Sequence, residues 1–266
     1  MKGETVKLPL RSPIEYKALW EVDRIGQASR LVAEALLALR EESQPGVKTA
    51  ELDRFAEAFL LERGAQAAFK GYRGYPCTVC TSVNEEVVHG LPSERRLQEG
   101  EIVSLDLGAI VEGYYGDAAL TVPVGEISPE ARRLLEVTRE ALHRGIAAAV
   151  SGQHLTDISH AIQTHVEADG FSVVRIFVGH GIGRALHEEP QIPNFGPPGR
   201  GPLLKPGMVL AIEPMVNAGT HEVTILEDRW TAVTQDGSLS AHFEHTIVIT
   251  EKGPEILTRS ETGETW

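Results

Sequence analysis

The apolar residues of the chain follow two periods, and the changes between them predict its helices and strands. In four stretches the apolar residues recur every three or four positions, the spacing of an amphipathic helix. The first stretch predicts a long helix that starts at a capping box, Ser12-Pro13-Ile14-Glu15, and ends at Gln44-Pro45-Gly46. The second predicts a shorter helix that Thr49 caps and that ends at Gly64.

The same order of elements returns in the second half of the chain. Ser128-Pro129 opens a long helix that closes near Ser151-Gly152, and Thr156 caps a shorter helix that stops at Gly170. The apolar run Phe171–Val178 then predicts a strand.

A finer match places a carboxylate at the same point of each half. Leu97–Asp106 aligns with Leu204–Glu213 at one constant offset, with leucine, glycine and the terminal acid in register. The chain therefore reads as two similar halves, about residues 12–125 and 128–250. A pseudo-two-fold axis between them would bring both carboxylates to the centre.

This duplication predicts the fold class. We expect an α+β protein with a single catalytic domain over residues 1–266, in which antiparallel sheets from two pseudo-symmetric halves cup a shared site. The helices of both halves would lie outside these sheets.

Two aspartates lie on a predicted β-hairpin. β-Rich runs flank the turn-like break Val111-Glu112-Gly113 within Ile102–Asp117. Folded back, these runs would place Asp106 and Asp117 roughly opposite each other, with Cβ atoms about 4.5–5.5 Å apart. Such carboxylates repel, so one must be protonated or a cation must lie between them. Taken alone, the pair favours the simpler interpretation of a hairpin with two solvated aspartates, and only the rest of the chain reverses this.

Composition narrows the possible partners. The net charge is −13, which argues against a nucleic-acid partner because DNA-binding proteins carry a basic stripe. No apolar stretch approaches the length of a membrane span, and the first residues lack the apolar centre of a signal peptide, so we expect a cytoplasmic protein. No second cysteine pair completes a zinc site with Cys77 and Cys80, and we expect two reduced, partly buried thiols.

Further candidate ligands follow later in the chain. His180 and His187 lie on a glycine-rich loop, in which Arg184 stands where a dinucleotide-binding motif needs glycine. Glu244 lies in the apolar run Ser238–Ile249, where an uncompensated carboxylate would be costly to bury. Together these observations yield one set of candidate ligands: Asp106, Asp117, His180, Glu213 and Glu244.

Four carboxylates and one imidazole are too acidic for a structural zinc site, which prefers cysteine and histidine. They suit two divalent metal ions, which in such sites lie about 3.5–4 Å apart.

These motifs resemble methionine aminopeptidase of the bacterial type I class. The resemblance runs from about Ile14 to Ile249 and includes Gly-His180-Gly-Ile-Gly-Arg, His187-Glu-Glu-Pro and Glu244-His-Thr. It implies the two-halved pita-bread fold. It also implies that the five residues bind two divalent metal ions, cobalt, manganese, iron or zinc, with Asp117 and Glu244 bridging them.

The resemblance also implies roles for other residues. His89 would contact the scissile amide nitrogen, and His187 would hold the substrate carbonyl and stabilise the oxyanion. Glu213 would take a proton from the attacking water and pass it to the leaving amine. The walls of the methionine pocket would be Tyr72, Tyr75, Cys80 and Trp230. Ala185-Leu186 replaces the Gly-Phe of the family pattern, and Phe69 and Cys77 stand at positions that vary within the family, which bears on fine substrate preference.

The implied reaction is hydrolysis of the N-terminal methionine from nascent proteins when the second residue is small. Its partners would be nascent chains, met in transient association with the ribosome, and we expect a monomer that binds neither DNA nor membrane. Two alternatives stay open: a proline-directed (X-Pro) aminopeptidase, and a non-catalytic binding protein of the same fold.

Overall fold

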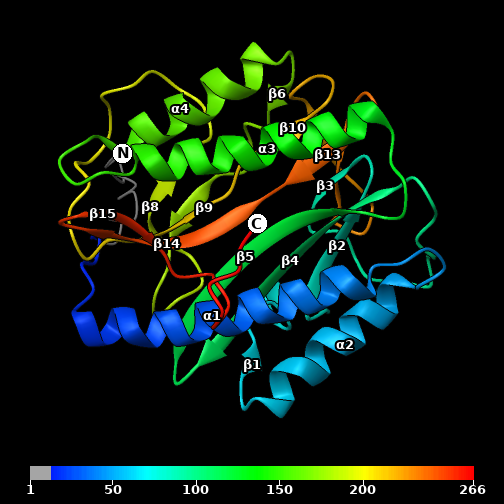
Figure 1. Ribbon diagram of the computed structural model, residues 1–266, viewed down its shortest axis with the longest axis horizontal. Coiled ribbons are helices and arrows are strands. Elements are labelled where there is room, and N and C mark those ends of the chain that lie inside the picture. Colours follow the sequence, from blue (N-terminus) through cyan, green and yellow to red (C-terminus); the bar gives the residue numbers. More distant parts are fainter. Residues whose placement is uncertain (1–12) are drawn as a thin grey trace, which may run out of the picture.

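The computed structural model describes residues 13–266, in which two pairs of helices lie against a large antiparallel sheet (Figure 1). The helices are α1 (Leu19–Glu42), α2 (Thr49–Glu62), α3 (Pro129–Ala148) and α4 (Leu155–Ala168), with a short 3₁₀ turn, η1 (Tyr72–Gly74). Of the helices in this part of the chain, none combines the length and apolar character that a bilayer crossing requires.

One sheet of nine strands runs through both halves. Its order is β1-β4-β5-β14-β9-β7-β8, with β2 also paired to β4 and β15 to β14. The strands are β1 (Gln66–Ala67), β2 (Val79–Val83), β4 (Ile102–Val111), β5 (Tyr114–Pro123), β7 (Gly179–Gly181), β8 (Glu188–Ile192), β9 (Val209–Ile212), β14 (Glu244–Thr250) and β15 (Gly253–Ile256). The halves join where Glu244 of β14 pairs with Ala119 of β5.

Two small sheets pack together at one end of the large sheet. One has the order β13-β10-β6, and the other β11-β12-β3. Their strands are β3 (Glu86–Val88), β6 (Ser172–Val173), β10 (Met215–Asn217), β11 (Val223–Ile225), β12 (Ala232–Thr234) and β13 (Ser240–His242). Val88, Met215 and Ala232 form a small apolar cluster between them.

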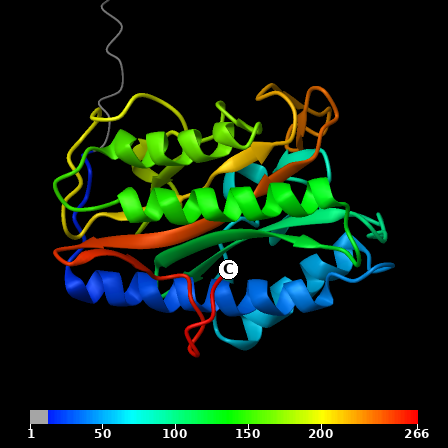
Figure 2. The same ribbon diagram turned by 45° about the horizontal axis from the view of Figure 1, so that its top comes forward.

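The helices cover one face of the large sheet. Figures 1 and 2 show α1 and α3 running across this face, with β5 and β14 between them. Leu105 and Leu107 of β4 belong to the same apolar core as Leu36 of α1 and Leu134 of α3. Successive side chains of a strand alternate between faces, so Asp106 points away from the helices. The site therefore lies on the face of the sheet that the helices leave free.

The first helix begins later than its sequence predicts. Ser12 lies outside the described residues, and helix α1 starts only at Leu19. The predicted capping box is therefore wrong. The free backbone N–H of Ala18 donates to the Glu21 carboxylate at 3.1 Å, whereas the Glu15 carboxylate accepts from the ammonium of Lys17 at 2.6 Å. By contrast, α3 begins as predicted, because the Ser128 hydroxyl caps it.

Thr49 and Thr156, both predicted as caps, lie inside their helices. The Thr49 hydroxyl exchanges hydrogen bonds with the backbone of Ser93, at 3.2 Å to the carbonyl and 2.9 Å from the N–H. The Thr156 hydroxyl does the same with Arg200, at 3.1 and 2.8 Å. Because equivalent residues make equivalent contacts in each half, the predicted two-halved architecture is confirmed at the level of individual hydrogen bonds.

Two predicted strands are shorter than expected. Within Phe171–Val178 only Ser172–Val173 forms a strand, and Phe177 turns to pack edge-on against the ring of His89. The run Ser238–Ile249 breaks at Phe243 into β13 and β14, which belong to different sheets. A continuous β-rich run does not reveal where a chain leaves one sheet for another.

The predicted hairpin forms, with a different register. Its turn is Glu112-Gly113, with φ of 49° and 79°, a conformation that suits a two-residue turn. Asp106 therefore pairs with Ala119, and Asp117 with Gly108. The prediction of directly opposed aspartates is wrong because the turn is centred between Glu112 and Gly113, one residue later in the chain than direct pairing of Asp106 with Asp117 requires. Diagonal neighbours on one face lie about 7–8 Å apart, which leaves room for an ion between them.

Candidate metal centre and active site

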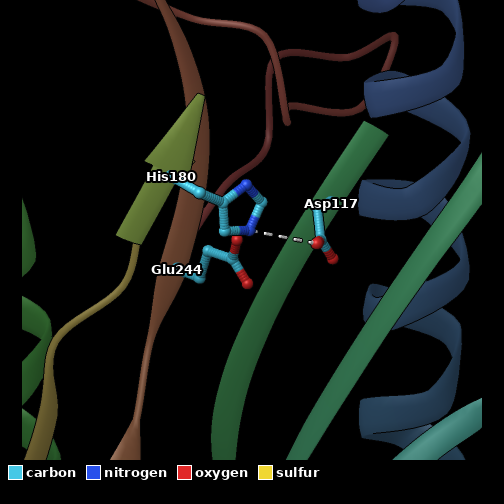
Figure 3. Close-up of side chains that lie close together, drawn as sticks. All are labelled: Asp117, His180 and Glu244. Atoms are coloured by element: carbon cyan, nitrogen blue, oxygen red, sulfur yellow. Dashed lines mark ion pairs between the residues drawn. The ribbon is translucent and has the colours of Figure 1, made fainter. Parts of the chain in front are cut away.

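Side chains from three strands of the large sheet converge on one point (Figure 3). Asp117 of β5, His180 of β7 and Glu244 of β14 are buried, and each offers one ligand atom within 4.8 Å of the others. Nε2 of His180 faces Asp117, 3.8 Å from its Oδ2 (Figure 3).

The other two candidate ligands line the same cavity. Asp106 projects from β4, and Glu213 directly follows β9. Oε1 of Glu213 lies 3.6 Å from Nε2 of His180. The structure thus brings together all five residues that the sequence predicts. It does so because β4, β5, β14, β9 and β7 are neighbours in one sheet.

The four carboxyl groups are destabilised as anions. Burial raises the pKa of Asp106 to about 7. Burial and repulsion from Asp106 raise the pKa of both Asp117 and Glu213 well above the usual range. Burial and repulsion, first from Asp117, do the same to the pKa of Glu244. The metal-free cluster therefore retains protons that a bound cation would displace.

His180 is held in the form that ligates metal. Burial lowers its pKa to about 4, so the imidazole is neutral at pH 7. Its Nδ1 lies 2.9 Å from the carbonyl oxygen of Gly181. We assign the ring proton to Nδ1, because a carbonyl can only accept. The lone pair of Nε2 then faces the carboxylates, as metal-ligating histidines require.

The donor set fits divalent metal ions. One oxygen on each of Asp106, Asp117 and Glu244 is buried and has no hydrogen-bond partner within residues 13–266. A buried polar atom without a partner is costly, and a cation at this point would satisfy all three. Carboxylate oxygens combined with one imidazole suit divalent transition metals.

His89 lies at the end of β3 in a strained backbone conformation. Its φ of 60° is in the left-handed region, which is uncommon for residues other than glycine. The next residue is held firmly: the Gly90 N–H donates to the Ser82 hydroxyl at 3.1 Å, and its carbonyl accepts from the Tyr75 hydroxyl at 3.0 Å. A Cβ at Gly90 would overlap the carbonyl oxygen of Thr81. Strain of this kind, imposed by surrounding contacts, is typical of functional sites.

His187 lies between the metal centre and an aromatic ring. Its ring stacks on Tyr72 at 5.3 Å between centroids, and its Nδ1 is 2.9 Å from the Tyr72 hydroxyl. The centroid of His180 is 4.3 Å away. Burial, then repulsion from His180 and Arg73, lowers the pKa of His187 to about 3. His187 is therefore a neutral hydrogen-bonding group at pH 7.

One cavity of about 150 Å³ is lined by the carboxylates and, beside them, by apolar and aromatic side chains. Its wall contains Phe69, Tyr72, Tyr75, Cys80, Leu186 and Trp230. Tyr75 packs edge-on against Trp230 at 5.2 Å, and Cys80 pairs directly with Asp106 across β2 and β4. The cavity therefore begins beside the metal centre. Cys77 and Cys80 are free thiols, as predicted, and burial raises the pKa of Cys80.

Two residues of this region were missed from the sequence. Arg73 lines the cavity with a left-handed backbone, φ 49°. His242 is 1% exposed, and its Nε2 lies 3.8 Å from Oε2 of Glu213. Its position two residues before Glu244 could have identified it, because residues i and i+2 of a strand share a face. No comparable signal marked Arg73.

Comparisons with known proteins agree with this geometry. Residues 23–251 match Metallopeptidase family M24. Methionine aminopeptidase 1 of Bacillus subtilis is 56% identical over 239 residues, which cover 90% of this chain and 96% of that protein. The crystal structure of methionine aminopeptidase from Thermotoga maritima is 50% identical with a TM-score of 0.91, and covers 92% of this chain and 99% of that one.

A prolidase from Pyrococcus furiosus is more distant. It is 26% identical with a TM-score of 0.74, and this chain covers 66% of its length. The fold and the acidic centre are those of a metallopeptidase with the pita-bread fold, as predicted. The chain belongs to metallopeptidase family M24, on its methionine aminopeptidase branch.

Proposed function

We propose that this protein is a metal-dependent aminopeptidase that removes the N-terminal methionine of polypeptides whose second residue is small. The observation that carries the proposal is a single cavity of about 150 Å³ that is lined both by an acidic metal centre and by an apolar wall. A cavity of that volume can hold a six-carbon ring, and the side chain of methionine has fewer heavy atoms than such a ring. Cys80 and the aromatic rings around it suit a thioether, because sulfur packs favourably on ring edges.

Two divalent ions would be held by five residues: Asp106, Asp117, His180, Glu213 and Glu244. When bound, such ions polarise a carbonyl and lower the pKa of water. The sheet supports this assignment, because these residues belong to five neighbouring strands or their ends. Both halves contribute, which supports one catalytic domain rather than two.

His187 would donate a hydrogen bond to the substrate carbonyl as it becomes an oxyanion. For this its Nε2 must carry the proton while the ring stays neutral. The Tyr72 hydroxyl, 2.9 Å from Nδ1, selects that tautomer by donating to Nδ1. The pKa of about 3 keeps the ring neutral across the physiological range. A neutral imidazole is an effective electrophile in other enzymes.

Glu213 would accept the proton of the attacking water and deliver it to the leaving amine. Its carboxylate lines the cavity beside the other candidate ligands, with Oε1 3.6 Å from Nε2 of His180, so it is within reach of a water held there. His89, fixed by Gly90 at the end of β3, would contact the scissile nitrogen. Burial lowers the pKa of His89, so it too is neutral at pH 7.

The partners of this reaction would be nascent chains in the cytoplasm. The enzyme would act on them as a monomer, in transient contact with the ribosome. The acidic centre also suits the positively charged α-amine of such a chain. That amine would lie beside the carboxylates while the side chain enters the apolar cavity, so only the first residue of a peptide can be held this way.

The tripeptides Met-Ala-Ser and Met-Leu-Ser test the proposal. The second side chain must pass His89 and His187, and a displacement of the carbonyl by about 1 Å costs on the order of 10²-fold in rate. We expect kcat/KM for Met-Ala-Ser to exceed that for Met-Leu-Ser by at least this factor in metal-loaded protein.

The alternatives give different results in the same assay. Faster cleavage of X-Pro peptides would identify a proline-directed enzyme. Peptide binding without turnover, at full metal content, would identify a non-catalytic binding protein.

A further inference from the structure

A buried ammonium group ties the beginning of the described chain to the loop that bears His187. The side chain of Lys17 is 2% exposed. Its Nζ lies 2.6 Å from Oε2 of Glu15 and 2.7 Å from Oε2 of Glu188. Burial disfavours the charged form of Lys17, but the hydrogen bonds to Glu15 and Glu188 outweigh it and raise the pKa. The ammonium is therefore charged in the folded protein.

The second oxygen of Glu188 holds the preceding loop. Its Oε1 accepts hydrogen bonds from the backbone N–H groups of Arg184, at 2.7 Å, and Ala185, at 3.1 Å. One carboxylate thus joins the ammonium of Lys17 to two consecutive amides. Those amides lie immediately before Leu186 and His187, which line the cavity.

The ammonium also packs closely beneath this loop. A Cβ at Gly183 would lie 2.5 Å from Cε and 2.7 Å from Nζ of Lys17. The backbone N–H of Lys17 donates to the carbonyl of Gly207 at 2.7 Å, so the main chain below the ammonium is held as well. Lys17 therefore presents a fixed charge to Glu188 rather than a mobile surface side chain.

We propose that Lys17 is a positioning residue, which acts through Glu188 to hold the loop 183–187 so that His187 meets the substrate carbonyl. This inference rests on the proposed role of His187 as the oxyanion donor. Glu188 directly follows His187, so a shift of the clamped loop moves the imidazole relative to Tyr72 and His180. The competing explanation is that the ion pair only fastens the chain before α1 to the sheet.

Replacement of Lys17 by methionine separates these explanations. Lys17→Met keeps the apolar stem of the side chain but removes the charge. We expect kcat for Met-Ala-Ser to fall about 10-fold, the cost of displacing a catalytic group by a fraction of 1 Å. KM should change less than about twofold and metal content should stay at the wild-type level. Glu188→Gln, which breaks the ion pair and leaves an amide oxygen for the loop, should show the same pattern.

Lys48→Met is the matched control. Lys48, like Lys17, is a lysine in an ion pair, with Glu94 at 2.5 Å, but it lies before α2 and does not line the cavity. Its kcat should equal the wild-type value. A lower melting temperature with unchanged kcat in both Lys17→Met and Glu188→Gln, assayed below their melting temperatures, would overturn the proposal and leave a fastening role only.

The His187→Ala background distinguishes this inference from the proposed function. If Lys17 acts through His187, then Lys17→Met should lower kcat no further once His187 is absent, because coupled residues are not additive. An undiminished 10-fold loss in that background would overturn the inference alone. Full activity of the single variant His187→Ala would instead overturn the role of His187, and no turnover of Met-Ala-Ser by metal-loaded wild-type protein would overturn the function itself.

Discussion

Two regions of the cavity differ in how many of their polar atoms have hydrogen-bond partners within the protein. The carboxylate floor (Asp106, Asp117, Glu213 and Glu244) rises from the middle of the large sheet. The aromatic wall (Tyr72, Tyr75, Trp230 and His187) belongs to η1, loops and strand ends. Three of the four floor residues have a buried oxygen with no partner among the described residues. In the wall, the Tyr75 hydroxyl reaches the Gly90 carbonyl and the Tyr72 hydroxyl reaches His187.

The difference separates two kinds of dependence. The buried oxygens of the floor gain a partner only when a cation binds, so variants of the floor should lose metal and activity together. The hydroxyl groups of the wall have hydrogen-bond partners within the protein, so variants of the wall should alter catalysis or substrate binding at constant metal content. Four experiments test this division, in order of decreasing expected effect.

Asp106→Asn should have the largest effect. It removes one ligand charge, and loss of even a hydrogen bond that orients a ligand costs about 10–100-fold. We therefore expect activity to fall by more than about 10²-fold and metal content, measured by elemental analysis, to fall with it. Far-ultraviolet circular dichroism should not change. Asp23→Asn, at an exposed position on α1, is the control. Full metal occupancy with near-native turnover would remove Asp106 from the ligand set.

His187→Ala should lower kcat by about 10²–10³-fold, the range for loss of one oxyanion donor. Metal content should equal that of the wild type, because His187 belongs to the wall. Elemental analysis and steady-state kinetics on one sample check both statements. Parallel loss of metal would instead make His187 a ligand and break the division between floor and wall.

In metal-free protein, the stability of the wild type relative to the Asp106→Asn variant should fall as pH rises from about 4 to 7. The folded-state pKa of Asp106, about 7, lies above its ordinary value. The folded wild type therefore binds a proton at Asp106 that the unfolded wild type has released, so its free energy of unfolding falls with pH relative to that of the variant. The buried histidines, whose pKa values are lowered and act in the opposite direction, are common to both proteins. Urea unfolding of both proteins in a chelator measures the difference, and a difference of the opposite slope would contradict a buried, repelled Asp106 in the floor.

Tyr72→Phe should have the smallest effect. It removes one hydrogen bond to His187, worth about 0.5–1.5 kcal/mol, which corresponds to a fall of about 2–10-fold in kcat. The phenyl ring should still stack on His187, so KM and metal content should stay nearly constant. Tyr115→Phe, on the same chain but outside the cavity lining, should leave kcat unchanged. Equal effects of the two variants would mean that the Tyr72 hydroxyl does not select the tautomer of His187.

Much of the site could be predicted because most of its residues belong to short sequence motifs. The hairpin that carries Asp106 and Asp117 follows from the β-rich runs on either side of Glu112-Gly113. This turn needs positive φ angles, which few residue types other than glycine adopt readily. The correspondence of Asp106 with Glu213 placed both at the centre before any fold was known. A methionine aminopeptidase relationship was likewise visible, and the comparisons confirm it.

The sequence by itself determined the properties that depend on neighbours along the chain: the helical periodicity, the two-halved order of elements and the identity of the acidic ligands. Tertiary structure alone decided the register that sets Asp106 diagonal to Asp117 and the break of the predicted strand at Phe243. It also decided that α1 starts at Leu19, because the Glu15 carboxylate binds Lys17 instead of capping a helix. It also decided the contacts of Lys17 with Glu188 and of His242 with Glu213. The physical reason is that local preferences depend on a residue and its near neighbours, whereas hydrogen-bond register and buried charge pairing depend on which distant segments reach the same place.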